Sequence, residues 1–479
     1  MTNIQKNYSY WDHFTEADIP FLERAAAGAA LPVVLLVSLF GGGCSEQQEE
    51  IPQDKPLPFP DGGFDEDVNS SVAPIPTEND DAARDGGVAP PVTDGGVSDT
   101  TDAYGDSCVP SACLSEVIQS NGTSNVCQQF ADISRTAGLL SPTPHQGAAI
   151  GDINSDGMPD VILLNQDGHH QAFQNLGGSF NEITDQAGLP VVDASKAILE
   201  DVTGDGTEDL VLVGSQGAYL YANENGRFEA YDRHEGVITQ EASTSVAWMD
   251  GKLIVGTENG LRAYKRLSGR YVEASAEYGL IDPAQAYGLV VEDFNNDGRQ
   301  DVFVANATGP NRLFRQKQDG SFESIENDVG LENVGASIDA TWTSWNGKPA
   351  LYVANYNAPN QFFIQENGQF NDHARDLGLQ VLGNTVQIAP NGSWAEHPAF
   401  YLGRWDQENL FLVPQTQDEN EFNHYREAGG DLHLNVSGQN VFSEWLDFNQ
   451  DGKLDLLTVM ADGGVHLFEN QSHEMRTCP

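Results

Sequence analysis

Phe130-Ala-Asp-Ile-Ser-Arg-Thr-Ala-Gly138-Leu139 returns 50 residues later as Phe180-Asn-Glu-Ile-Thr-Asp-Gln-Ala-Gly188-Leu189, with the same spacing from the aromatic residue to the glycine. The same aromatic-to-glycine frame recurs five more times, at Phe228/Gly236, Tyr271/Gly279, Phe322/Gly330, Phe370/Gly378 and Phe422/Gly430. Successive copies begin 43 to 52 residues apart. A period near this length, made of short strands and turns, is typical of a propeller with four strands per blade. The sequence therefore predicts an all-β fold, a seven-bladed β-propeller.

The order of strands within a repeat predicts how the ring closes. After each frame comes a turn, then an apolar strand such as Val161–Leu164, then a short strand that often ends in Asn, as at Asn175 and Asn470. No outer strand follows Asn470, whereas the first copy of the frame precedes the first blade. We expect Phe130–Ser134 to supply the missing outer strand of the last blade, because this removes an exposed sheet edge. The propeller is predicted to span residues 127–479.

Four of the seven repeats carry an acidic loop with Asp at positions one, five and nine, Asn or Thr at three, and Gly at six. Calcium takes six to eight oxygen ligands, and in such a loop positions one, three and five turn inward while position seven offers a backbone carbonyl. A solvated turn is the alternative for a single copy, but four copies in register with the repeat favour Ca²⁺. The predicted ligand positions are Asp152, Asn154, Asp156, Met158 and Asp160; Asp201, Thr203, Asp205, Thr207 and Asp209; Asp293, Asn295, Asp297, Arg299 and Asp301; and Asp447, Asn449, Asp451, Lys453 and Asp455.

The other three repeats lack this set of carboxylates. Their turns read Trp248-Met-Asp-Gly251, Trp345-Asn-Gly347 and Asn391-Gly-Ser-Trp394. We expect plain hairpins there, without bound metal.

Taken together, the Phe130–Leu139 frame, the Asp152–Asp160 loop and the Phe173-Gln-Asn-Leu-Gly-Gly-Ser-Phe180 strand-and-turn resemble FG-GAP/VCBS-type repeats. Repeats of this type also form the integrin α-subunit propeller and the cartilage acidic protein family. The resemblance covers roughly Cys127 to the C-terminus. It implies a seven-bladed propeller with calcium in outward-facing loops between strands of a blade, and it carries over only to the four acidic loops.

The N-terminal 44 residues predict export. Ala25–Gly43 is uncharged with an apolar centre, Arg24 precedes it, and small residues lead up to Cys44. This layout is that of a signal peptide, and its terminal cysteine resembles the acylated cysteine of a bacterial lipoprotein. The alternative is an uncleaved membrane anchor, for which the apolar run is just long enough. Both interpretations place the remainder outside the cytoplasm, at the cell envelope or cell surface.

Residues 45–126 are rich in Pro, Gly, Asp and Ser, with few apolar residues to build a core. We expect a disordered acidic linker. Four cysteines remain after Cys44, and in an exported chain they can form two disulfides. Closure of the ring brings Cys127 near Cys478, which leaves Cys108–Cys113 as the second pair, although the sequence allows three connectivities.

The net charge of −49 argues against nucleic-acid partners, because a polyanion would be repelled. No catalytic constellation stands out; His169-His170 beside Asp167 is expected to be a solvated turn. The predicted function is a non-catalytic, calcium-stabilised binding or adhesion module on a monomeric propeller, with an extracellular protein or glycan as partner. A carbohydrate-binding lectin is the first alternative, and a polysaccharide-degrading enzyme is the second. The tryptophans near the blade turns are expected to pack in the core, with a few left for a recognition platform; they are Trp248, Trp342, Trp345, Trp394, Trp405 and Trp445.

Overall fold

The computed structural model describes residues 126–127, 129–231, 236–331, 336–392, 397–418 and 421–474. The predicted signal and linker up to residue 125, and with them Cys44, Cys108 and Cys113, lie outside these ranges, as does Cys478. Within them the chain is mostly β-strand, and each helix is a single turn. None of the described helices is long and apolar enough to cross a membrane.

The described strands pair antiparallel in seven units of four, which we number as blades along the chain. In blades 1 and 2 they are β3 (His145–Gly151), β4 (Asp160–Asn165), β5 (Gln171–Asn175) and β6 (Phe180–Glu182), then β7 (Lys196–Glu200), β8 (Asp209–Gly214), β9 (Gly217–Asn223) and β10 (Phe228–Ala230), with β11 (Val237–Thr239) also paired to β9. In blades 3 and 4 they are β12 (Ser243–Met249), β13 (Lys252–Thr257), β14 (Gly260–Leu267) and β15 (Arg270–Glu273), then β16 (Ala286–Glu292), β17 (Asp301–Asn306), β18 (Arg312–Gln316) and β19 (Phe322–Ser324).

Blades 5 to 7 complete the set, and β25 also pairs with β28, so that blades 6 and 7 share one sheet. In blades 5 and 6 the strands are β20 (Ser337–Trp345), β21 (Lys348–Asn355), β22 (Gln361–Glu366) and β23 (Gln369–Asp372), then β24 (Thr385–Asn391), β25 (Ala399–Glu408), β26 (Leu410–Asp418) and β27 (Glu421–Glu427). Blade 7 consists of β28 (Ser437–Leu446), β29 (Asp455–Met460), β30 (Val465–Asn470) and β2 (Phe130–Asp132).

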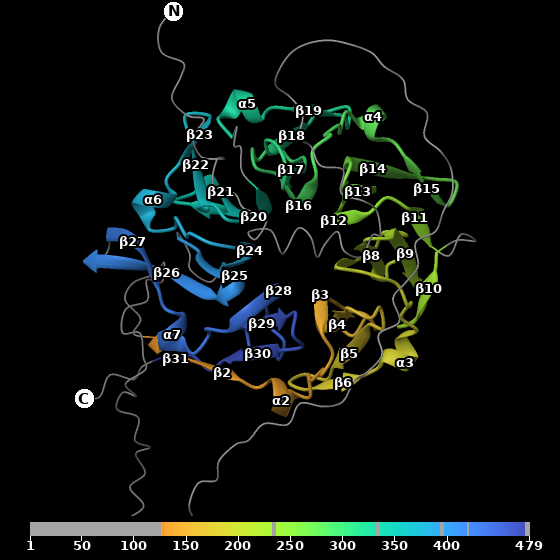
Figure 1. Cartoon of the computed structure of the whole chain (residues 1–479), viewed down its shortest axis with the longest axis horizontal. Helices are drawn as coiled ribbons and strands as arrows, with labels where there is room; N and C mark the ends of the chain where they lie inside the picture. The colour runs from red at the N-terminus through yellow and green to blue at the C-terminus, as the bar shows by residue number, and fades with distance from the viewer. Residues whose placement is uncertain are drawn as a thin grey trace, which may run out of the picture. The chain divides into compact units, whose positions relative to one another are not determined.

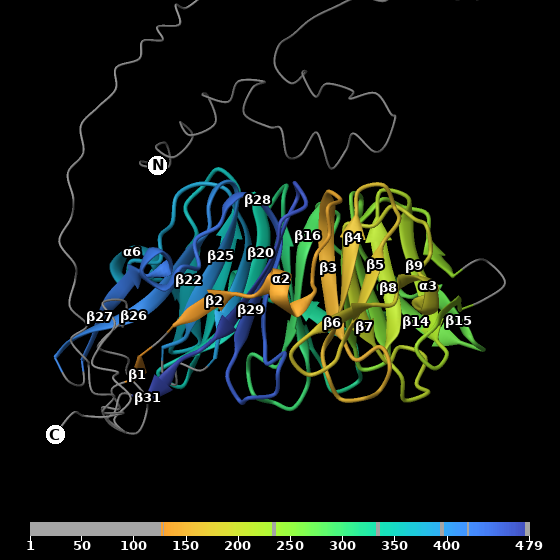
Figure 2. The same ribbon diagram turned by 90° about the horizontal axis from the view of Figure 1, so that it is seen from below.

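These blades form a closed ring (Figure 1), and the first strand of each contacts the first strand of the next, including β28 with β3. Figure 2 shows the strands running between the two faces of the ring. The predicted closure is confirmed, because β2 pairs with β30 and places Phe130 opposite Asn470. A second pairing, of β1 (Val126–Cys127) with β31 (His473–Glu474), joins the two ends of the propeller. The Cys127–Cys478 disulfide stays a prediction.

The second strand of a blade is the centre of its core. In β4 and β8 every residue is buried, because blades on both sides cover the two faces of the sheet. Ile162 and Leu164 of blade 1 pack in one cluster with Leu199 and Leu210 of blade 2. This two-sided burial explains why these strands are continuous apolar runs rather than alternating ones.

The repeated frame forms the outer strand, a one-turn helix and a left-handed residue before the next blade. Gly138 has a φ of 81°, and an added Cβ would lie 2.8 Å from the carbonyl oxygen of Phe180, so both conformation and space require glycine. Leu139 follows and is fully buried. The helices of this kind are α2 (Ser134–Ala137), α3 (Thr184–Ala187), α4 (Ser275–Tyr278), α5 (Glu326–Val329), α6 (Ala374–Leu377) and α7 (Gly429–Leu432).

The predicted register of the seventh frame, Phe422/Gly430, is wrong. The left-handed residue that ends α7 is His433, with a φ of 59°, and the matching aromatic residue eight positions earlier is the buried Tyr425. The β26–β27 hairpin is long, with Asp418 opposite Glu421 near its tip, and the aromatic residue of the frame lies three residues further along the chain than predicted. A histidine in the glycine position concealed the shift in the sequence.

Asparagine side chains at the ends of third strands form hydrogen bonds to neighbouring blades. The Asn175 side-chain amide donates to the Phe448 carbonyl of blade 7 at 2.7 Å, and that of Asn223 donates to the Ile153 carbonyl of blade 1 at 2.8 Å. Both asparagines are buried, and each also donates to the residue just before its own second strand, Pro159 or Glu208. In blades 1 and 2 the Asn that ends the third strand is therefore an inter-blade contact, whereas Asn470 of blade 7 donates to Leu454 of its own blade.

Replacing Asn223 by Ala is expected to lower the free energy of unfolding by about 1–3 kcal/mol, because two buried carbonyls lose their donor. Urea denaturation measures this change. Glu224→Ala is the matched control: the neighbouring side chain is exposed, and its loss is expected to change stability by less than about 0.5 kcal/mol. Equal effects of the two variants would contradict a stabilising role of the Asn223 hydrogen bonds.

Candidate metal loops

The four acidic loops join the first and second strands of blades 1, 2, 4 and 7, so they lie on the same face of the ring. Blades 3 and 5 have two-residue turns at this place, Asp250-Gly251 and Asn346-Gly347. Both residues of each turn have positive φ, as in type I′ hairpins. The expectation of plain hairpins is confirmed for these two blades. The turn of blade 6 includes residues 393–396, which lie outside the described ranges.

The carboxylate at position one organises each loop. In blade 1, Oδ1 of Asp152 accepts from the Asp156 N–H at 3.0 Å, and Oδ2 accepts from the Gly157 N–H at 2.7 Å. The matching bonds in the other loops, from the N–H groups of positions five and six to the carboxylate at position one, measure 2.7 to 3.0 Å. The position-five carboxylate accepts in turn from the N–H of position seven, as Asp156 does from Met158 at 2.9 Å. The loops therefore share one geometry.

Positions four and six are left-handed in all four loops. Ser155 has a φ of 61° and Gly157 a φ of 82°. An added Cβ at Gly157 would meet nothing within 4 Å, so the glycine is required by its conformation and not by space. The sharp turn expected at position six is confirmed.

Asp at position nine has a role that the sequence did not reveal. Asp160 is fully buried at the start of β4, where Oδ1 accepts from the Asn175 N–H at 2.7 Å and Oδ2 from the Ile153 N–H at 3.0 Å. It thus ties the loop to the third strand of the same blade. Burial raises its pKa to about 6; the two backbone hydrogen bonds oppose this shift, and the charges of Asp156 and Asp152 add to it. Asp301 and Asp455 are buried in the same way, with pKa values raised to about 6 and about 7, and burial also raises the pKa of Asp209.

Position seven separates the loops into two kinds. Arg299 forms an ion pair with Asp297 in blade 4, and Lys453 pairs with Asp451 at 3.1 Å in blade 7. In blade 2 the Thr207 hydroxyl instead donates to Asp205 at 2.6 Å, and in blade 1 the residue is Met158. The loops of blades 1 and 2 therefore keep the larger net negative charge.

The residues present fit a hard cation by their chemistry, since positions one, three, five and nine supply oxygen donors that calcium prefers. Asn295 at position three of blade 4 supports this, because its side-chain oxygen is buried and accepts no hydrogen bond within the described chain. The carboxylates themselves are turned toward backbone N–H groups. In the ranges that the structure covers, no group of three or more His, Cys, Asp or Glu side chains is gathered as for a metal.

Other residues singled out in the sequence are structural. Trp345 and Trp405 are buried, and Trp248, Trp342 and Trp445 pack against core clusters, so core packing is confirmed for these five. Trp394 lies outside the described residues. The expectation of a solvated turn at His169-His170 is wrong for one partner: His170 is buried, its Nδ1 accepts from the Asn165 N–H at 3.2 Å, and burial lowers its pKa to about 4.

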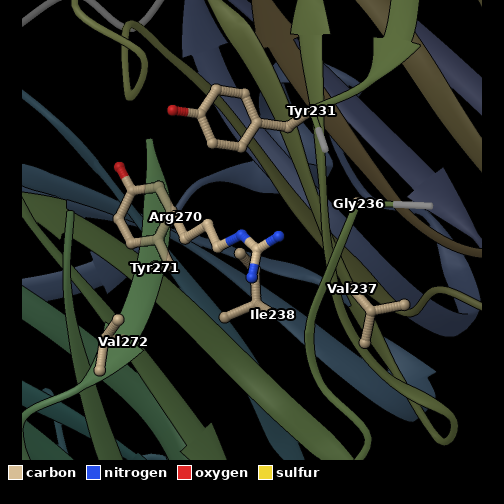
Figure 3. A pocket seen from close by; sticks show the side chains of 7 residues that line it. All are labelled: Tyr231, Gly236, Val237, Ile238, Arg270, Tyr271 and Val272. Atoms are coloured by element: carbon tan, nitrogen blue, oxygen red, sulfur yellow. The ribbon is translucent and has the colours of Figure 1, made fainter. Parts of the chain in front are cut away.

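A pocket of about 300 Å³ between the outer strands of blades 2 and 3 was not anticipated. Figure 3 shows Tyr231 and Tyr271 in its wall, with the Arg270 side chain extending from beside Tyr271 toward Ile238 and Val237. Tyr271 opens the fourth frame of the repeat, and Tyr231 lies three residues after Phe228, which opens the third. Only the docking of two neighbouring blades turns them into a shared surface.

Comparison with known proteins supports the repeat assignment. Residues 293–344 match the family described as FG-GAP-like repeat. Cartilage acidic protein 1 of Xenopus tropicalis is 26% identical over 367 residues, which cover 65% of this chain and 56% of that protein. The human protein of the same name is 22% identical over 370 residues, covering 65% and 55%. The chain thus spans about half the length of these relatives.

Solved structures with a similar course of the chain include Sqt1 of Saccharomyces cerevisiae, at 8% identity and a TM-score of 0.44, covering 73% of this chain and 99% of that one. BBS1N in complex with ARL6DN matches at 14% identity and a TM-score of 0.45, covering 73% and 98%. The repeat frame, the ring of antiparallel blades and the matched segment lead to one conclusion: the chain is a β-propeller protein with a segment that matches the FG-GAP-like repeat, and it is similar to cartilage acidic protein 1.

Proposed function

We propose that this protein is a calcium-stabilised extracellular binding module that does not transform its ligand. The observation that carries the proposal is the identical hydrogen-bond geometry of four acidic loops on one face of the ring, each holding oxygen donors for a hard cation. Asp152, Asn154, Asp156 and Asp160 of blade 1 and their counterparts would hold the ion, with the carbonyl of position seven as a further donor. Bound calcium would offset the electrostatic repulsion among the loop carboxylates. This repulsion is costly because the carboxylate at position nine is buried.

Calcium is expected to raise the melting temperature, and EGTA to lower it. At a calcium concentration ten times the dissociation constant, one site adds about 1.4 kcal/mol. Asp156→Asn keeps an acceptor for the Met158 N–H but removes the charge, so it should reduce the calcium-induced shift and leave the melting temperature in EGTA close to that of the parent. Differential scanning calorimetry measures both.

Asp185→Asn serves as the control, because this exposed carboxylate in α3 lies outside the loops. It should preserve the full calcium shift. A melting curve of the parent protein that does not respond to calcium would refute the metal assignment.

The location rests on the N-terminal sequence. Cys44 would be acylated after export, which would place the propeller at the cell envelope on the linker of residues 45–126. Cys44→Ser is expected to move the protein from the membrane fraction to the soluble exported fraction, as followed by fractionation and by the mass of the N-terminal peptide. Cys108→Ser should leave the distribution unchanged, and a Cys44→Ser protein that stays with the membrane would favour the uncleaved anchor.

Binding without turnover distinguishes the module from an enzyme. The purified protein, immobilised with calcium, is expected to retain selected extracellular glycans or proteins and to release them in EGTA with their covalent structure intact. Mass spectrometry of the released ligand and an assay for new reducing ends provide the readout. Products whose formation depends on the protein would replace this proposal with the polysaccharide-degrading enzyme.

A further inference from the structure

The described lining of the pocket between blades 2 and 3 carries a positive charge, whereas the chain as a whole is acidic. Its walls include Ile238 of β11 and Val272 of β15 with the two tyrosine rings, and the one charged side chain that lines it within the described ranges is Arg270 (Figure 3). No described carboxylate pairs with this guanidinium, although the chain carries 72 acidic residues against 23 basic ones. The four residues between Tyr231 and Gly236 lie outside the described ranges.

The two tyrosines give the pocket its shape. Their ring centroids are 6.3 Å apart with an interplanar angle of 57°, and Trp248 meets the Tyr271 ring edge-on at 6.4 Å. The Tyr231 hydroxyl makes no hydrogen bond to another described residue. The pocket thus combines apolar ring faces, one free hydroxyl and one guanidinium, in a volume that suits a single sugar ring better than a long chain.

Both tyrosines are held by the acidic loop of blade 2. The Tyr271 hydroxyl donates to the carbonyl of Val202, position two of that loop, at 2.8 Å. Arg266 donates to the carbonyl of Thr203, position three, and its guanidinium lies 5.6 Å from the centroid of the Tyr231 ring. Tyr231, Ile238 and Tyr271 of the pocket also belong to one apolar cluster with Val202. The loop backbone therefore determines the positions of the Tyr231 and Tyr271 rings in the pocket wall.

We propose that this pocket binds a single carboxylated sugar unit at the end of an otherwise neutral glycan, and that the loop Asp201–Asp209 positions its walls. Arg270 would pair with the carboxylate, and the tyrosine rings would cover the apolar face of the pyranose. A polyanionic glycan is disfavoured, because the net charge of −49 would repel every unit beyond the first. The calcium dependence of this site rests on the proposed function; the pocket chemistry does not.

Titration calorimetry of the full chain in calcium tests the ligand class with three probes: a neutral trisaccharide ending in glucuronate, the same trisaccharide ending in glucose, and a glutamate-rich peptide. The glucuronate probe should bind at least tenfold more tightly than the other two. Arg270→Gln should weaken it at least tenfold, whereas Arg227→Gln, an exposed arginine beside β10, should not. Equal binding of the two sugars, preference for the peptide, or an unaffected Arg270→Gln variant would overturn the assignment.

A separate experiment tests whether the loop Asp201–Asp209 positions the pocket walls. Tyr271→Phe keeps the ring and removes the bond to Val202, and should weaken the glucuronate probe severalfold with little change in melting temperature. Asp205→Asn should weaken the probe at least fivefold more than Asp451→Asn in blade 7, and calorimetric melting reports calcium binding separately for each. Equal losses in the two loop variants would reject the coupling. A calcium-dependent melting shift without any probe binding would reject this pocket and leave the proposed function standing.

Discussion

Antiparallel pairing of β2 with β30 closes the ring, and the burial of every blade depends on that closure. The middle strands are apolar on both faces, so each blade needs a neighbour on either side. An open ring would expose the core of two blades and an unpaired edge. The β2–β30 pairing joins opposite ends of the propeller sequence, so its formation carries a cost in loop-closure entropy. Only apolar burial around the whole ring offsets that cost.

Side-chain hydrogen bonds between neighbouring blades fix the positions of these blades within the closed ring. Asn175 reaches from blade 1 to blade 7, Asn223 from blade 2 to blade 1, and Tyr271 from blade 3 to blade 2. All three donate to the backbone carbonyl at position two of an acidic loop. The loops of blades 1, 2 and 7 are therefore not independent surface turns, because a hydrogen bond from the adjacent blade holds the backbone of each.

Electrostatics gives the loops unequal properties despite their shared backbone. Clustered carboxylates on one face are costly in a chain of net charge −49. Arg299 and Lys453 neutralise part of that charge in blades 4 and 7, and the loops of blades 1 and 2 have no such cation at position seven. A divalent ion would therefore relieve more repulsion in blade 1, whereas the Arg266 guanidinium of blade 3 already lies against the blade 2 loop. The pocket of blades 2 and 3 adjoins one of these more acidic loops, through Arg266 and Tyr271.

Spacing in the sequence determined the architecture: the repeated frame, the alternating strands and turns, the closing strand at Phe130 and the acidic loops follow from local patterns that each blade repeats. The register of the last frame could not be predicted, because the long β26–β27 hairpin places the frame three residues further along the chain and His433 occupies the glycine position. Burial of Asp160, the inter-blade hydrogen bond of Asn223 and the pocket lined by Arg270 were decided by tertiary structure alone. The Asn223 bond and the pocket depend on which residues of two neighbouring blades meet, and the burial of Asp160 depends on how its loop meets the third strand of its own blade. The spacing of residues within a repeat carries no information on these contacts.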